Sequence, residues 1–311
     1  MSAKNTITVT KPLLKVGCTL GEGPLYDAAT GVLHFVDIIE QKVYHLNTET
    51  LALATEVFDE AITCLALRKN GEGLACLTAT GIATLQGNST LHYLAKPLPQ
   101  NVVEANSRFN DGACDRKGRF FAGTIHSRTH KDIRGQLWMY DPESGDCHLA
   151  DEGPFTDSNG LGWSPDGKTM YFTDSLVNKI FAYDYEDGKL SNRRVAVDAL
   201  AVGLPEQSFC DGFCVDNEGY IWSARWGGSQ INRFSPNGEL DTTIRFPTVF
   251  HVTACCFGGA DQDKLYVTSA HCAAIGGDAT RQKQFPDSGH LFMVDLRGQF
   301  KGGEWRFPFG G

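Results

Sequence analysis

The chain lacks any long hydrophobic run. No stretch of its 311 residues approaches the roughly 18 consecutive apolar residues that a membrane helix needs. The opening, MSAKNTITVTKPLLKV, has no apolar core of the kind that a signal peptide requires. We therefore expect a cytoplasmic protein that makes no contact with a membrane.

Several short motifs and sequence features are also missing. There is no GxSxG nucleophile elbow and no HExxH zinc-protease spacing. No Pro- or Ser-rich linker divides the chain, no polar tract is long enough to predict disorder, and convincing helix periodicity is absent. We therefore expect one globular domain over residues 1–311 that is built from strands.

Charge and cysteine spacing exclude further classes. The formal net charge of −9 argues against a nucleic-acid partner or an anionic membrane surface. The 10 cysteines are scattered through strand-like runs and include no CxxC pair. In a cytosolic chain, this distribution is typical of buried, reduced thiols.

An internal repeat is the main feature that the sequence does contain. From Asn159 it reads as four strands, over 160–164, 169–175, 180–185 and 194–200, with Gly at the turns. The pattern recurs from Asp111 and Asp211, and weaker copies start at Gly21, Thr63 and Thr253. Repeated four-strand meanders of about 40 to 50 residues are typical of a β-propeller. The sequence therefore predicts an all-β, six-bladed β-propeller.

A propeller has to close its ring of blades. A single meander exposes its edges, so the blades must pack radially against one another. We expect the N-terminal strand over residues 6–9 to complete the last blade beside the C-terminal strands. A two-sheet sandwich or several small β domains are the alternative, which the absence of a linker disfavours.

One polar position recurs near the start of every unit. It lies 8 residues before the hairpin glycine in three units (Gly71, Gly167 and Gly219), and 7 or 9 residues before it in two others. The sixth unit has a longer turn and is aligned by its run TACCFG. The six equivalent residues, which we expect to precede the innermost strands, are Glu22, Thr63, Asp111, Asn159, Asp211 and Thr253.

Equivalent positions of a propeller lie at one height around its central channel, so we expect these six side chains to converge on the mouth of the channel. Three carboxylates, one amide and two hydroxyls would repel one another there unless a cation lay among them. Oxygen donors suit a hard divalent ion such as Ca²⁺, Mg²⁺ or Mn²⁺, and they tolerate Zn²⁺. The joint register therefore predicts one divalent cation at a central metal site, although each Asp-Gly or Asn-Gly pair alone is ordinary turn chemistry.

A series of short runs carries a resemblance over nearly the whole chain. In order they are Gly21 to Pro24, Arg108 to Gly112, Gly118-Arg119, Ala122 to Thr124, Asn159-Gly160, Ser164 to Gly167, Tyr171 with Thr173 to Ser175, Asp211-Gly212, Trp222, and Trp226 to Gly228. Together they resemble the SMP-30/gluconolactonase/regucalcin-like family of sugar lactonases. The resemblance implies a six-bladed propeller that holds one divalent cation in its channel and hydrolyses lactones, which are cyclic carboxylic esters.

The same resemblance implies roles for individual residues. The metal ligands would be Glu22, Asn159 and Asp211. Asp211 would also act as the catalytic acid/base. Arg108 and Asn110 match positions that contact the substrate, and Asp111 would have a supporting role.

The chain departs from the family pattern at two places. Vertebrate members carry a sugar-contacting glutamate after the Gly-Thr run, whereas the nearest residue here is Arg128. Their Tyr-Asn-Gly-Gly run is replaced by Arg225 to Gly228. An arginine at the mouth would favour an acidic or more oxidised sugar, unless Arg128 is simply a solvated surface residue. His126 follows the Gly-Thr run, and we add it as a candidate for substrate contact.

We therefore predict divalent-metal-dependent hydrolysis of a sugar lactone to the aldonic acid. The expected partner is the small-molecule lactone, and the expected state is a monomer or weak homodimer. Two alternatives stay open. The same site would suit a metal-dependent esterase or phosphotriesterase, and the propeller would also suit a non-catalytic calcium-binding protein.

Overall fold

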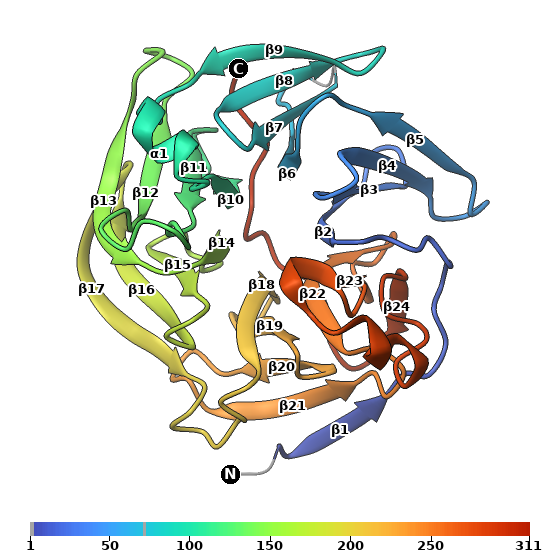
Figure 1. Ribbon diagram of the computed structural model, residues 1–311. Coiled ribbons are helices and arrows are strands. Elements are labelled where there is room, and N and C mark those ends of the chain that lie inside the picture. Colours follow the sequence, from blue (N-terminus) through green and yellow to red (C-terminus); the bar gives the residue numbers. More distant parts are fainter. Residues whose placement is uncertain (1–2, 71–72) are drawn as a thin grey trace.

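The computed structural model of the protein describes residues 3–70 and 73–311, and its regular structure consists almost wholly of strands (Figure 1). The helix α1 (Gln100–Glu104) and the 3-10 turns η1 (Ala274–Gly276) and η2 (Ala279–Lys283) lie in connections between strands. Within the described part of the chain, no helix is both long enough and apolar enough to span a bilayer. Gly71, one of the hairpin glycines that set the repeat spacing, lies outside the described residues.

Six sheets surround a common centre in the described chain (Figure 1), which confirms the predicted all-β, six-bladed propeller. The first three blades comprise β2 (Gly21–Asp27), β3 (Val32–Asp37), β4 (Lys42–Asn47) and β5 (Leu53–Val57); β6 (Ile62–Leu67), β7 (Leu74–Thr78), β8 (Ile82–Gln86) and β9 (Thr90–Ala95); and β10 (Phe109–Cys114), β11 (Phe120–Thr124), β12 (Gly135–Tyr140) and β13 (Cys147–Phe155).

The other three blades follow in the same chain order. They comprise β14 (Ser158–Trp163), β15 (Thr169–Asp174), β16 (Lys179–Glu186) and β17 (Lys189–Asp198); β18 (Phe209–Val215), β19 (Ile221–Trp226), β20 (Gln230–Phe234) and β21 (Leu240–Arg245); and β22 (His251–Gly258), β23 (Lys264–Ala270) and β24 (Phe292–Asp295). The first strand of each blade contacts the first strand of the next, and β22 contacts β2. The innermost strands therefore form a closed ring.

The N-terminal strand lies elsewhere than predicted. β1 (Asn5–Thr8) pairs in parallel with β21, as an outer strand of the fifth blade. The last blade has three strands, and beside it the backbone N–H groups of Leu13 and Leu14 donate to the carbonyl of Leu291, at 2.8 and 3.1 Å. The placement of residues 6–9 in the last blade was therefore wrong, because a short strand pattern does not specify which exposed edge it joins.

The C-terminal tail, residues 302–311, crosses the centre of the ring (Figure 1). It forms bridges or backbone hydrogen bonds with Asp216, Trp163, Cys114 and Arg68, which lie at the last residue of the innermost strands of four blades or just beyond it. The tail thus ties these blades together near the ends of their inner strands, and it leaves the starts of those strands free to form a site.

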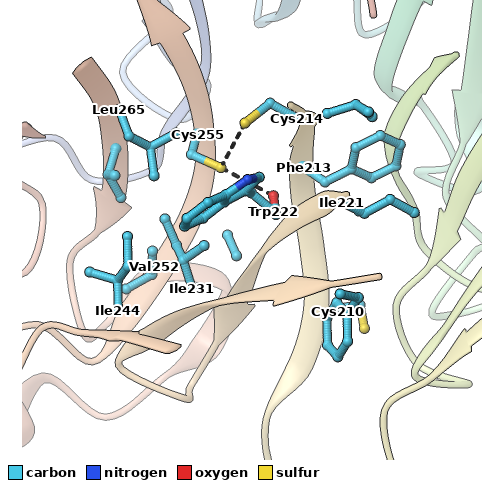
Figure 2. Close-up of a cluster of buried hydrophobic side chains, with 14 of the residues drawn as sticks. Cys210, Phe213, Cys214, Ile221, Trp222, Ile231, Ile244, Val252, Cys255 and Leu265 are labelled. Atoms are coloured by element: carbon cyan, nitrogen blue, oxygen red, sulfur yellow. Dashed lines mark hydrogen bonds between the residues drawn. The ribbon is translucent and has the colours of Figure 1, made fainter. Parts of the chain in front are cut away.

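The core lies between neighbouring blades. Figure 2 shows part of its largest cluster, in which Trp222 is fully buried. There the thiol of Cys255 donates to the carbonyl of Trp222, and the sulfurs of Cys214 and Cys255 are 3.5 Å apart. All ten cysteines are free; Cys147 is half-buried and the other nine are buried. The prediction of buried cysteines is confirmed for all of them except Cys147.

Candidate active site

The six recurring positions lie inside the innermost strands, as the second or third residue of each, and not before the strands as predicted. At each of them the pairing register with the second strand of the blade is shifted. Such bulges break the strict alternation of a strand and turn a side chain in a new direction. A bulge therefore occurs at the same height in all six blades.

Three of the six side chains line a cavity of about 260 Å³ at this height, namely Glu22, Asn159 and Asp211. The hydroxyl of Thr253 donates instead to the carbonyl of Gly21, at 2.6 Å. The hydroxyl of Thr63 turns toward the second strand of its own blade. The prediction that all six converge on the mouth was therefore wrong for the threonines, because their short side chains bond to nearby backbone.

Asp111 is the third ring residue that does not line the cavity. Its carboxylate lies 3.5 Å from the guanidinium of Arg306, which comes from the C-terminal tail. The Nε–H of Arg306 also donates to the carbonyl of Leu161, at 3.0 Å. The repeat register could not predict this pair, because the tail lies outside the repeat.

Glu22 and Asp211 form an acidic pair, in which the negative charge of Glu22 acts on Asp211. Glu22 accepts the backbone N–H of Gly23 at 3.0 Å, and Asp211 accepts that of Gly212 at 3.1 Å. Burial, followed by the charge of Asp111, raises the pKa of Glu22 to about 8. Burial and the charge of Glu22 hold the pKa of Asp211 well above its usual range.

The donors in this cavity fit a divalent cation. Two carboxylates and the Asn159 amide are hard oxygen donors, and an ion between them would offset the repulsion that raises both pKa values. Neither carboxylate has an ion pair with a lysine, arginine or histidine of the described chain. The described residues hold no group of three or more His, Cys, Asp or Glu placed to bind a metal, so the amide would have to complete the set.

A chain of hydrogen bonds links the neighbouring blades three and four along one side of the cavity. Arg108 Nη1 donates to Asn110 Oδ1 at 2.7 Å, and Asn110 Nδ2 donates to Asn159 Oδ1 at 3.1 Å. Asn159 Nδ2 in turn donates to Ser175 Oγ at 2.8 Å. These bonds fix the Asn159 amide, and they place the two predicted substrate contacts beside a predicted metal ligand. Burial lowers the pKa of Arg108 to about 10, so its guanidinium stays charged near neutral pH.

The two loop candidates occupy different places. Arg128 lines the cavity and is exposed, at the mouth beside Arg108. His126 is not among the lining residues that the structure describes; its Nδ1 lies 2.9 Å from the Thr156 carbonyl and 3.4 Å from Asp157 Oδ1. His126 thus lies beside Asp157, which does line the cavity.

Sequence reasoning missed a second layer of the site. Four further lining residues stand two positions before a recurring position: Leu20, Asp157, Phe209 and His251. Residues two apart on a strand share a face, so the register that found the first layer could also have found the second. Ser175 and Trp226, which lie at or just after the ends of second strands, also belong to the lining.

Comparisons with known proteins agree with this architecture. Residues 20–271 match the model of the SMP-30/Gluconolactonase/LRE-like region. Regucalcin of Oryctolagus cuniculus is 34% identical over 91% of this chain and 92% of its own length. A solved luciferin-regenerating enzyme is 25% identical, with a TM-score of 0.85 over 97% of this chain and 99% of its own.

A second solved structure shares the fold at lower identity. The calcium-binding protein regucalcin of Agrobacterium tumefaciens has a TM-score of 0.83 at 23% identity, over 98% of each chain. The family match spans all six blades from just before β2 to just after β23. On the family match and the identity to regucalcin, the chain belongs to the SMP-30/gluconolactonase/LRE-like family.

Proposed function

We propose that this protein hydrolyses a sugar lactone to the open-chain aldonic acid, with a divalent cation held by Glu22, Asn159 and Asp211. The observation that carries the proposal is the acidic pair of half-buried Glu22 and buried Asp211, neither of which makes an ion pair in the described chain, in the same cavity as Arg108 and Asn110. Membership of a family described in part as gluconolactonase supports the choice of a lactone.

The bound cation would supply a Lewis acid for the lactone carbonyl oxygen. Asp211 Oδ1 already accepts the Gly212 N–H, so we assign the proton of the attacking water to Oδ2. As the acyl C–O bond breaks, the same oxygen returns that proton to the ring oxygen, and the products are a carboxylic acid and a hydroxyl; the acid then ionises by releasing its proton to solvent. Arg108 and Asn110 would donate hydrogen bonds that hold the lactone in place, so their loss would chiefly impair positioning.

The proposal includes the setting of the reaction. The partner is a small molecule, the protein acts in the cytoplasm, and it is a monomer or weak homodimer. Neither nucleic acid nor a membrane takes part.

A lactone panel tests the proposal. Purified protein would be incubated with gluconolactone, galactonolactone and pentonolactones, with EDTA or with one added divalent ion, and acid release would be followed. We expect turnover that EDTA abolishes and that an added ion restores. Absence of turnover of every lactone, or turnover unaffected by EDTA, would refute it.

Two further arms separate the alternatives. An aryl ester and an organophosphate in the same assay would identify an esterase or phosphotriesterase by a higher kcat/KM. Asp211→Asn should lose activity, whereas a non-catalytic calcium-binding propeller would bind Ca²⁺ and have no activity to lose.

A further inference from the structure

One wall of the cavity is apolar. It is formed by Leu20, Ile38, Phe209, Trp226, Ala274 and Ile275. Leu20, Ile38 and Ala274 belong to one buried hydrophobic cluster, and Trp226 packs against it. Four of the six wall residues therefore belong to, or pack against, one apolar core.

The wall lies opposite one group of polar residues across the ring. The wall comes from blades five, six and one, whereas Arg108, Asn110, Arg128, Asp157, Asn159 and Ser175 come from blades three and four. Inner-strand contacts run from each blade to the next around the ring, so blades three and four face blades six and one. Ile125 and Leu176 are the apolar residues on the polar side. The cavity is therefore amphipathic, and the acidic pair comes from the same blades as the wall, with Glu22 on blade one and Asp211 on blade five.

His251 lines the cavity beside this wall. Its ring stacks on Trp226 with centroids 3.8 Å apart and an angle of 22° between the planes. The residue is 4% exposed, and neither ring nitrogen has a hydrogen-bond partner of good geometry in the described chain. Burial lowers the pKa of His251 to about 4, so the ring is neutral near pH 7. An apolar group against Trp226 would thus displace no hydrogen bond that His251 makes with the protein.

Ile275 has an unusual backbone conformation for its residue type. It lines the cavity, is 38% exposed and has φ of 53° and ψ of 38°. A β-branched residue in the left-handed region is a conformational outlier, where Asn or Gly would be favoured. Local backbone geometry therefore does not account for an isoleucine here, but an apolar surface facing a ligand does.

We propose that, besides a sugar lactone, this cavity takes lactones that carry an apolar substituent. The inference rests on the proposed lactone hydrolysis and extends its substrate class. The ester group would lie between Arg108 and Asp211, and the substituent would lie on Trp226 and Ile275. Hydrolysis would be the same reaction as for a sugar lactone: one water is added, the acyl C–O bond breaks and a hydroxy acid is released.

A series of δ-lactones with alkyl chains of increasing length tests this inference. Each buried methylene contributes about 0.8 kcal/mol, so we expect kcat/KM to rise by up to about fourfold for each methylene that the wall covers. Glucono-δ-lactone serves as the reference in the same assay. A flat or falling series, with gluconolactone still hydrolysed, would overturn the inference and leave the proposed function intact.

The Ile275→Asn variant tests the wall directly. Asn tolerates the left-handed conformation, so this change removes apolar surface without adding backbone strain. We expect the ratio of kcat/KM for a long-chain lactone to that for gluconolactone to fall about tenfold. Leu51→Asn is the matched control, because Leu51 also has positive φ, at 58°, is 40% exposed and does not line the cavity. An equal ratio in both variants would overturn the inference.

A binding measurement keeps the inference testable if no lactone is hydrolysed, the result that would refute the proposed function. Saturation-transfer NMR with δ-nonalactone would detect contact between the alkyl chain and the protein. We expect chain-length-dependent binding that Ile275→Asn weakens and Leu51→Asn does not. No binding, or binding equally strong in both variants, would overturn the inference.

Discussion

The amide of Asn159 illustrates how position decides the role of a residue. Asn-Gly pairs are ordinarily turn residues, yet Asn159 lies in β14 at a bulge, between Asn110 and Ser175. Its hydrogen bonds hold the amide in one orientation at the cavity. The chemistry of the site thus depends on which side-chain atoms remain free to bind a ligand after the others have formed hydrogen bonds within the protein.

Replacing Asn159 tests that role at the residue scale. Asn159→Ala removes one oxygen donor, so we expect divalent-cation affinity to fall at least about tenfold. The lost hydrogen bonds should cost only roughly 1 kcal/mol of folding stability. Isothermal titration calorimetry with Ca²⁺ and urea unfolding would measure the two effects.

Asn159→Asp is the matched control, since it retains an oxygen donor and should retain cation binding. Unchanged affinity in Asn159→Ala would return Asn159 to the class of turn residues.

At the scale of elements, side chains on neighbouring strands of a blade contact one another. In the first blade, His34 and His45 face each other on β3 and β4, and their Nδ1 atoms are 2.6 Å apart. His45 Nε2 lies 3.0 Å from Glu56 on β5. Burial, and then the neighbouring His45, lower the pKa of His34 to about 4. The folded blade therefore holds His34 neutral.

The contribution of His34 in the first blade to folding stability should depend on pH. The unfolded chain binds a proton at His34 below about pH 6.5, whereas the folded chain binds it only near pH 4. Stability is thus present above pH 6.5 and is lost as the pH falls toward 4. We expect His34→Gln to reduce the loss between pH 7.5 and 4.5 by about 2 kcal/mol, measured by urea unfolding. His92→Gln, at an exposed position on β9, should leave the loss unchanged; equal losses in the two variants would contradict the prediction.

At the scale of the whole molecule, the C-terminal tail and the cavity lie at opposite ends of the inner strands. The tail lies near one end of these strands, and the cavity is lined from their starts. Phe309 in the tail is fully buried and packs beside Phe120 and Tyr140, with ring centroids 6.2 and 6.1 Å away. A segment outside the repeat thus contributes to the packing between the second and third blades.

Truncating that contact tests the contribution of the tail. Phe309→Ala should destabilise the protein by about 3–5 kcal/mol, because it leaves a cavity between blades that the remaining backbone cannot fill. The midpoint of urea unfolding would measure this change. Leu53→Ala, at a position 37% exposed on β5, is a control that should cost much less. A cost for Phe309→Ala as small as that of the control would show that the tail is not part of the core.

The sequence by itself determined the six-bladed propeller and the register of six recurring positions, from which the family resemblance selected Glu22, Asn159 and Asp211. Both follow from a local pattern of strands and turns repeated along the chain. Tertiary structure alone decided that β1 joins the fifth blade, that Asp111 pairs with Arg306, and that the hydroxyl of Thr253 turns away from the cavity. Tertiary structure also decided which residues form the apolar wall of the cavity. These outcomes depend on contacts between segments far apart in the chain, and a repeat encodes the geometry of each blade but not which distant side chain or edge will meet it.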